Sequence, residues 1–538
     1  MSTGFVEDET LQASVSIDDE FYKKRPFVDG SFTFINGVKK PYTKVTCVTS
    51  PIRGPDGERI QIGTEAHMTC EEATVAVDAA HKAFAGGLGV WPSMSLRDRI
   101  ITVEKYLDEV LKVRDEIISV LQWEICKNTN DATNEFDRTI KFVRDVIELI
   151  RSKGPTSIMQ PSFEEWTTIS GVTGKVRRGP YGIILCVAPF NYPLNEMYAM
   201  LIPALIMGNT IVLKIPSIGG LAHLLTADAF ALAFPPGVIN FISGSGRETM
   251  PCIMRTGKID MLGFIGGKKG CDSLIRDHLE PHRLKVFSQL EGNNMAIILP
   301  SANLDVAVQQ IISGTTSYNG QRCTAIKIVA VHTQIADDFV QKYKQALEKL
   351  KIGLPFDAAN SITPLPDENK PNYLAALIHD AKAKGATIVS GGTKHFTLIK
   401  PTALYPVPFE ARLFSEEQFG PLIPISKFDS IHPILSILAN SWNGQQLAIF
   451  CSGQDKDALT LLDKTQSIFG RININSAPSR GPDQFPFSAR RSSAMGTMSV
   501  SHAIEAFSLE VIVAYKDNPE NKVVADYLDS NSAFFTDP

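Results

Sequence analysis

The sequence of 538 residues is too long for one ordinary hydrophobic core and fits two or three domains of typical size. Hydrophobic residues make up 44% and charged residues 21%, a balance that is typical of folded proteins and excludes extensive disorder. A net charge of −5 without a long basic run excludes nucleic acid as a principal partner, and no apolar run could span a membrane. The acidic N-terminus matches no targeting signal, so these features indicate a cytoplasmic protein.

The eight cysteines are spread through the chain without CxxC pairs or metal-ligand spacing. This pattern predicts mostly reduced thiols, no disulfide framework and no metal site. A single cysteine is more often a small buried hydrophobe than a nucleophile, so context must identify a reactive one.

Helical patterns dominate the first part of the chain, after an acidic N-terminal arm. Apolar residues at helical spacing predict helices near 70–84, 95–126 and 131–151. A glycine pair and a proline separate the first two of these segments.

From Gly182 on, short apolar runs alternate with helical stretches. The runs predict strands at 183–188, 210–215, 238–242 and 259–265. Parallel strands need long crossover connections, so this alternation favours a doubly wound nucleotide-binding domain.

A second series of strands and helices starts near Ala296. A strand ends at Leu299, and Asn303 is placed to cap the helix that follows it. A further strand at 326–331 and a helix at 336–350 predict a second α/β domain.

Five sequence blocks carry a resemblance to a known family. They are Ala188 to Pro193 (APFNYP), Gly208 to Thr210 (GNT), Lys214 to Ser217 (KIPS), Gly320 to Ala325 (GQRCTA) and Glu417 to Pro421 (EQFGP). Their order and spacing agree over roughly residues 30–515, which is a stronger signal than any single glycine motif. The chain therefore resembles the aldehyde dehydrogenase superfamily.

This resemblance implies an α/β fold with a Rossmann-type cofactor domain, an α/β catalytic domain and a small β oligomerisation element. The predicted boundaries are an N-terminal arm at 1–30, a cofactor-binding domain at 31–161 and 181–290, a catalytic domain at 291–490, oligomerisation segments at 162–180 and 491–516, and a loosely ordered C-terminal tail at 517–538. The β-rich stretches Thr167 to Arg177 and Ala506 to Ala514 could pair across subunits, which predicts a homo-oligomer, a dimer or tetramer.

Oxidation of an aldehyde to an acid requires a nucleophile, a hydride acceptor and an activated water. The resemblance implies that Cys323 is the nucleophile and that the Asn191 amide, with the Cys323 N–H, stabilises the oxyanion. The family's base position falls on Gln289, which cannot accept a proton, and the nearest acid is Glu291. On a strand, a two-residue step keeps the same face, so Glu291 is the candidate base. Alternatively, Glu291 is structural and deacylation uses another group or is impaired.

The segment Gly263 to Gly270 connects a predicted strand to a predicted helix. Such a turn lets a pyrophosphate approach the helix N-terminus, with Gly266 and Gly267 in contact with the cofactor. Ile265 and Gly267 replace hydroxyl residues that are common in the family at this turn.

Four further positions match the family's cofactor ligands. The resemblance implies that Lys214 holds the adenosine ribose, Glu417 holds the nicotinamide ribose and Phe419 packs near the nicotinamide. Ser217 stands where NAD-selective relatives often carry an acid that would repel a 2′-phosphate. This favours NADP as the cofactor, with NAD possible.

Within the superfamily, the sequence is most similar to the non-phosphorylating, NADP-dependent glyceraldehyde-3-phosphate dehydrogenases. Arg138, Tyr192, Arg322 and Arg480 resemble the substrate-phosphate ligands of that family. Guanidinium groups and a phenol suit a phosphate dianion, whereas three arginines without one would repel each other. The implied reaction, a step of glycolysis, oxidises D-glyceraldehyde 3-phosphate to 3-phosphoglycerate, with water releasing the acyl group.

Two alternatives stay open from the sequence. The enzyme could oxidise another aldehyde or semialdehyde, because each arginine taken singly is more often a surface or ion-pair residue. The chain could also be a catalytically silent paralogue with a binding or structural role, since Gln289 occupies the usual base position.

Overall fold

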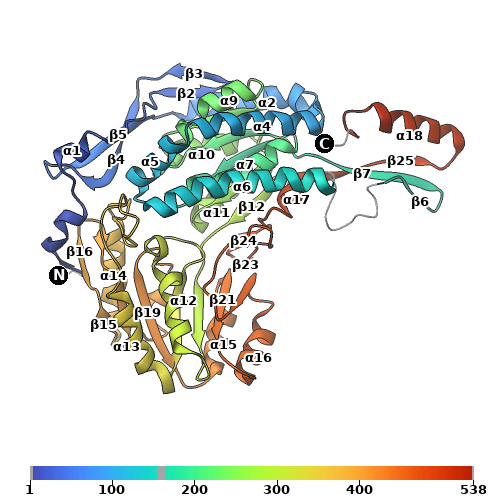
Figure 1. Cartoon of the computed structure of the whole chain (residues 1–538). Coiled ribbons are helices and arrows are strands. Elements are labelled where there is room, and N and C mark those ends of the chain that lie inside the picture. The colour runs from blue at the N-terminus through green and yellow to red at the C-terminus, as the bar shows by residue number, and fades with distance from the viewer. Residues whose placement is uncertain (1–3, 154–164, 536–538) are drawn as a thin grey trace.

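The structure is a computed structural model that describes residues 4–153 and 165–535. These residues form two α/β units and an arm that projects from the side of the molecule (Figure 1). None of the helices in these ranges is long and apolar enough to cross a membrane.

The first unit contains a six-stranded sheet in the order β10-β9-β8-β11-β12-β24. Its strands are β8 (Ile183–Val187), β9 (Thr210–Lys214), β10 (Ile239–Ile242), β11 (Met261–Ile265), β12 (Lys285–Gln289) and β24 (Ala494–Met495). All pair in parallel except β24, which is antiparallel to β12. The predicted parallel sheet is confirmed, and its strand order reverses between β8 and β11, where ligands bind in such sheets.

Helices cover this sheet on both sides (Figure 1). The main ones are α2 (Cys70–Phe84), α4 (Leu96–Lys112), α5 (Arg114–Ile125), α6 (Thr129–Lys153), α7 (Pro193–Ile206), α9 (Ala227–Ala233), α10 (Gly246–Arg255) and α11 (Lys268–Asp277). The single long helix predicted over 95–126 is wrong, because the backbone of Val113 (φ −104°, ψ 17°) leaves the helical region and divides α4 from α5. The strands β2 (Phe32–Ile35), β3 (Val38–Pro41), β4 (Val45–Arg53) and β5 (Arg59–Ala66) form two hairpins beside these helices.

The second unit contains a seven-stranded sheet in the order β15-β18-β19-β14-β13-β21-β22. Its strands are β13 (Asn294–Ile298), β14 (Ile326–His332), β15 (Thr387–Ser390), β18 (Thr402–Tyr405), β19 (Leu422–Phe428), β21 (Gln446–Phe450) and β22 (Arg471–Ile474). Its helices are α12 (Leu304–Thr316), α13 (Ala336–Leu347), α14 (Lys370–Ala383), α15 (Ile431–Asn440) and α16 (Lys456–Thr465). Along β13, Met295 and Ile297 pack into one apolar cluster, and Ala296 and Ile298 pack into another on the opposite face. Both faces of the sheet are therefore buried at this central strand, which explains why β13 is apolar from Met295 to Ile298.

The arm is a three-stranded antiparallel sheet in the order β25-β7-β6, made of β6 (Thr167–Ile169), β7 (Val172–Pro180) and β25 (Ser508–Lys516). The predicted β-rich stretches pair with each other within the chain. Their pairing across subunits, and the homo-oligomer that would result, stay a prediction. The segment predicted as a loosely ordered tail instead forms α18 (Pro519–Asn531), which is held to β7 by the ion pair between Lys175 and Asp529 (2.6 Å).

The described part of the N-terminal segment lies against the second unit. Its first strand, β1 (Val6–Glu7), pairs in parallel with β16 (Thr393–His395). The side chains of Leu11, Val15 and Ile17 are buried. The segment predicted as an arm is thus part of the packed body, because apolar residues alternate with its acidic ones.

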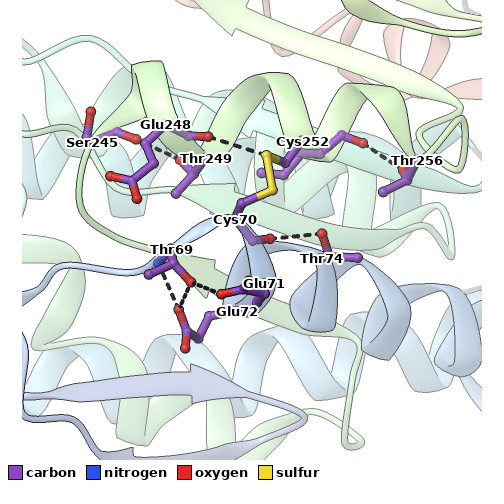
Figure 2. Close-up of a disulfide and its surroundings, with 11 residues drawn as sticks. Thr69, Cys70, Glu71, Glu72, Thr74, Ser245, Glu248, Thr249, Cys252 and Thr256 are labelled. Atoms are coloured by element: carbon purple, nitrogen blue, oxygen red, sulfur yellow. Dashed lines mark hydrogen bonds between the residues drawn. A yellow bond between two sulfur atoms is a disulfide. The ribbon is translucent and has the colours of Figure 1, made fainter.

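A disulfide joins Cys70, the first residue of α2, to Cys252 on α10 (Figure 2). The sequence predicted mostly reduced thiols, and this pair is the exception that the cysteine spacing did not indicate. The two cysteines are 182 residues apart in sequence, and only the packing of α2 against α10 brings their Cα atoms to 5.7 Å. The other six cysteines are free thiols.

Candidate active site

Two cavities meet at the reversal point of the first sheet. The Cys323 cavity, of about 780 Å³, is lined by Cys323, and the Lys214 cavity, of about 1080 Å³, is lined by Lys214. Four pairs of consecutive residues contribute one member to each cavity: Ala188 and Pro189, Phe264 and Ile265, Lys269 and Gly270, and Asn369 and Lys370. The cavities therefore adjoin, with the ends of β8 and β11 between them.

A sharply turned loop delivers Cys323 to its cavity. After α12, the backbone of Tyr318 (φ 48°), Asn319 (φ 56°) and Gly320 (φ 71°) lies in the left-handed region. A Cβ atom on Gly320 would lie 2.7 Å from the carbonyl oxygen of Gly420. Only glycine therefore fits at position 320 of this turn. The turn places Cys323 just before β14.

Lys327, on β14, ties this loop to the opposite wall of the cavity. Its ammonium group donates to the backbone carbonyls of Gly320 (3.3 Å) and Arg322 (2.8 Å). The same group forms a buried ion pair with Glu417 (3.2 Å). The position of the Cys323 thiol relative to the Glu417 carboxylate is therefore fixed by one side chain.

Asn191 follows β8 and lies beside the cysteine loop. Its buried amide donates to the carbonyl of Gln321 (2.8 Å), so it is held near Cys323 in a cavity that both residues line. The next residue, Tyr192, packs its ring against the ammonium group of Lys127, 3.4 Å from the ring centroid. Lys127 in turn forms a buried ion pair with Glu135, which also accepts backbone N–H groups at the start of α7.

The pKa of the Cys323 thiol is raised to about 11. Burial is the main cause, and the carboxylates of Glu196 and Glu417 contribute to the rise. The Gln445 amide and the Lys327 ammonium group act in the opposite direction. The thiol is therefore protonated at neutral pH in this ligand-free arrangement.

The four residues predicted to bind a phosphate, Arg138, Tyr192, Arg322 and Arg480, all line the Cys323 cavity. Arg138 makes a two-pronged contact with Asp483 (2.8 and 2.6 Å). Arg480 donates to Glu196 (2.6 Å), and Arg322 donates to two backbone carbonyls at the end of α12 (3.1 Å each). Three guanidinium groups thus face two carboxylates, which leaves one net positive charge in this cluster.

Two of these arginines retain buried N–H groups that are not used by the protein. Within the described residues, Nη2 of Arg480 and Nε of Arg322 have no hydrogen-bond partner. Buried donors are rarely left without an acceptor unless a ligand or water supplies it. The cluster can therefore accept an anion without breaking its existing ion pairs.

The segment with the candidate base differs from the prediction. Strand β12 ends at Gln289, and residues 290–293 are irregular, so the predicted two-residue step along a strand is wrong. Gln289 and Glu291 both line the Cys323 cavity. The Glu291 carboxylate accepts the backbone N–H of Lys268 (3.1 Å), the first residue of α11. It therefore sits at a helix N-terminus, which stabilises its negative charge.

The residues predicted to bind a cofactor are divided between the two cavities. Lys214 and Ser217 line the Lys214 cavity, and Gly266, Gly267, Glu417 and Phe419 line the Cys323 cavity. Burial lowers the pKa of Lys214 to about 8, and nearby Glu65 opposes that shift. Two adjoining cavities, with a buried lysine in one and a helix N-terminus in the other, fit the two halves of a nicotinamide dinucleotide.

Comparison with known proteins identifies the family of this chain. The profile of the "Aldehyde dehydrogenase family" matches residues 48–512. The chain belongs to the aldehyde dehydrogenase family. An "NADP-dependent glyceraldehyde-3-phosphate dehydrogenase" of Streptococcus equinus is 32% identical over 480 residues, which cover 88% of this chain and 96% of the relative.

Solved structures show the same fold for this aldehyde dehydrogenase. The NADP complex of the NADP-dependent glyceraldehyde-3-phosphate dehydrogenase from Bacillus halodurans C-125 superposes with a TM-score of 0.79 at 27% identity, covering 90% of this chain and 99% of that one. The betaine aldehyde dehydrogenase of Staphylococcus aureus, in complex with NAD⁺, superposes with a TM-score of 0.81 at 23% identity, covering 93% and 97%. Aldehydes as substrates and NAD or NADP as cofactor follow from membership of this family.

Some charged residues of the aldehyde dehydrogenase site escaped the sequence prediction. Glu196 lies in the otherwise largely apolar helix α7, and Lys327 is the single charge in the apolar run of β14. An isolated charged residue in a buried helix or strand can indicate a site residue, because a buried charge requires a partner of opposite charge or a ligand. Asp483 lies three residues after Arg480, but its pairing with Arg138 depends on the fold.

Proposed function

We propose that this aldehyde dehydrogenase oxidises D-glyceraldehyde 3-phosphate to 3-phosphoglycerate with NADP as hydride acceptor. The observation that carries the proposal is the convergence of three arginines and Tyr192 on the cavity that holds Cys323. The net positive charge and the two unpartnered N–H groups of this cluster suit a phosphate. The relatives named as NADP-dependent glyceraldehyde-3-phosphate dehydrogenases support the same substrate.

The chain supplies the groups for covalent catalysis. The Cys323 sulfur attacks the aldehyde carbon, the thiol proton passes to water, and the carbonyl oxygen becomes the oxyanion of a thiohemiacetal. The Asn191 amide and the Cys323 backbone N–H stabilise the oxygen of that adduct. Lys214, Ser217, Gly266, Gly267, Glu417 and Phe419 would hold the nicotinamide dinucleotide, which would supply the hydride acceptor. Loss of the hydride converts the thiohemiacetal at Cys323 into a thioester, and water then releases the acid and regenerates the thiol. Inorganic phosphate takes no part.

The side chains that line the Lys214 cavity favour NADP over NAD as the cofactor. Ser217 places a small hydroxyl, and no carboxylate, where an acid would repel a 2′-phosphate. Lys214 lies in the same cavity and carries a positive charge below a pH of about 8. Together these two residues tolerate the additional phosphate of NADP.

Glu291 is the proposed base that activates the deacylating water. It lines the Cys323 cavity, whereas Gln289 at the usual position has an amide that cannot accept a proton. A Glu291→Gln variant is expected to release about one equivalent of NADPH per chain in a rapid burst, followed by slow turnover, because only thioester hydrolysis needs the base. Steady turnover like that of the parent enzyme would show that the base lies elsewhere.

A catalytically silent paralogue is the second candidate, and the buried Gln289 is the observation that favours it. Phosphorus NMR of a reaction with D-glyceraldehyde 3-phosphate and NADP⁺, without inorganic phosphate, separates the two. The proposed enzyme forms 3-phosphoglycerate and NADPH in equal amounts over many turnovers. No product, or a single burst from the parent enzyme, would contradict the hydrolytic assignment.

A further inference from the structure

The disulfide between Cys70 and Cys252 holds a helix that forms part of the wall of the Lys214 cavity. Cys252 lies on α10, and Gly246 and Pro251 of the same helix line the cavity. A Cβ atom on Gly246 would lie 3.8 Å from the Cε atom of Lys214, so the start of α10 packs against this lysine. The disulfide is therefore attached one residue beyond a position that lines the cavity.

The segment that leads into Cys70 belongs to the same cavity wall. Glu65 and His67 line the cavity. The Glu65 carboxylate accepts the backbone N–H of Gly244, just before α10 (2.9 Å), and the His67 ring lies 3.3 Å from the carboxylate of Glu248 on α10. Noncovalent contacts thus join residues 65–70 to the first turn of α10, and the disulfide joins them covalently (Figure 2).

Helix α10 is weakened at the residue before its cysteine. Pro251 has no N–H group to donate to the carbonyl of Arg247, one turn earlier, and its ring crowds that carbonyl. Arg247 also lines the cavity. The disulfide therefore fixes α10 immediately after a break in the hydrogen bonds of the helix.

Apolar packing keeps α2 and α10 together independently of the disulfide. Ala73 and Val77 of α2 lie in one apolar cluster with Ile253 and Met254 of α10. Loss of the bond is therefore expected to loosen the cavity wall before Pro251 and not to unfold the domain.

The disulfide is accessible, and the chain needs reduced thiols elsewhere. Cys70 and Cys252 are both partly exposed. Six other cysteines are free, and one of them, Cys323, must be a thiol for covalent catalysis. Conditions that keep Cys323 reduced also act on an accessible disulfide. In reducing surroundings disulfides are rare, and those that occur are usually transient or redox-sensing.

We propose that Cys70 and Cys252 form a redox switch that sets the affinity of the Lys214 cavity for the adenosine half of the nicotinamide cofactor. The switch rests on the proposed function in placing that half of the cofactor in this cavity. The disulfide form is the high-affinity form, because a wall that is already fixed costs less to order when the ligand binds.

The reaction at the switch is thiol–disulfide exchange with an external dithiol. A thiolate of the dithiol attacks one sulfur of the Cys70–Cys252 bond, and the other cysteine leaves as a thiolate that takes up a proton. The second thiol of the reductant then resolves the mixed disulfide. Two electrons and two protons pass to the protein, which gains two thiols, while the reductant becomes a disulfide.

Direct binding of NADPH, followed by its fluorescence, tests the switch in the parent protein. Reduction by dithiothreitol should weaken binding roughly three- to tenfold, and reoxidation by oxidised dithiothreitol should restore it. The double variant Cys70→Ser/Cys252→Ser should bind as weakly as the reduced parent and should not respond to dithiothreitol. Cys451→Ser, which removes a partly exposed free thiol of the second unit, is the matched control and should keep the full response.

Two cofactor fragments localise the effect. The affinity for 2′,5′-ADP, the adenosine half of NADP, should fall on reduction as that for NADPH does, while the affinity for nicotinamide mononucleotide should be equal in both forms. Equal NADPH affinity in the two forms, tighter binding on reduction, a response that persists in the double variant, or an equal fall for nicotinamide mononucleotide would overturn the switch. Failure of both forms to bind NADPH would overturn the cofactor assignment of the proposed function as well.

Discussion

The two adjoining cavities hold their buried charges in different ways. In the Cys323 cavity, charges are paired between side chains, as in Lys327 with Glu417 and Arg480 with Glu196. In the Lys214 cavity, backbone N–H groups stabilise a buried carboxylate in place of a charged side chain. The Glu124 carboxylate accepts three consecutive backbone N–H groups, from Gly219 to Leu221 (2.7, 2.9 and 3.1 Å). Burial raises the pKa of Glu124 to about 7, and these hydrogen bonds oppose that rise.

This difference separates a reactive cavity from a binding cavity. Side-chain pairs fix the positions of charged groups and can accept a further charged ligand, as the arginine cluster around Arg480 illustrates. A buried carboxylate that accepts three backbone N–H groups, such as that of Glu124, shapes a wall and leaves little charge for chemistry. The Cys323 cavity should therefore respond strongly to single substitutions, and the Lys214 cavity more weakly.

The largest effect is expected at the nucleophile. Cys323→Ser should lower aldehyde oxidation by at least about a thousandfold, since a serine hydroxyl at this position lacks an accessible anion. Fluorescence titration should show that NADPH still binds. Near-normal turnover of the variant would exclude Cys323 as the nucleophile.

Next in size is the selectivity conferred by the arginine cluster. Arg322→Ala should reduce kcat/KM for D-glyceraldehyde 3-phosphate roughly 10- to 100-fold and leave that for unphosphorylated glyceraldehyde nearly unchanged. Arg276→Ala, which removes an exposed arginine on α11, serves as the control in the same steady-state assay. Equal losses on both substrates would indicate a structural arginine.

The raised pKa of Cys323 gives a test that needs no substrate. Because the thiol titrates near 11, its alkylation by iodoacetamide should accelerate about tenfold per pH unit between pH 7 and 9. Glu417→Gln removes a carboxylate that raises this pKa, so at pH 8 the variant should react several-fold faster. A rate that levels off near pH 7 would mean that the thiol is already ionised there.

The smallest effect is expected beside the Lys214 cavity, where the disulfide joins α2 to α10. Cys252→Ser should lower the melting temperature by a few degrees, since a disulfide contributes about 2–4 kcal/mol to stability. Cys47→Ser, at an exposed free thiol, should not. Thiol titration of the denatured, unreduced chain should detect six thiols, and a count of eight would show that the bond is absent.

Local patterns in the sequence were sufficient for most of the fold. The strands β8, β9 and β11 follow from short apolar runs, and Asn303 caps α12 as expected, with its side chain accepting two backbone N–H groups. These features depend on neighbours within a few residues. Propensity and periodicity therefore determine them.

Long-range contacts were not predictable in the same way. The bond between Cys70 and Cys252 joins residues 182 apart, and the pair of Arg138 with Asp483 joins two distant segments. The end of β12 at Gln289 also moved Glu291 from a strand face to the start of α11. Packing between elements decides each of these features.

The most direct test of the account is the ratio of kcat/KM for D-glyceraldehyde 3-phosphate to that for D-glyceraldehyde. It is measured from NADPH production at saturating NADP⁺, without inorganic phosphate. Contacts from the arginine cluster to the phosphate predict a ratio above about 100, with continuous turnover. A ratio near 1 would contradict selection of a phosphorylated substrate by this cavity.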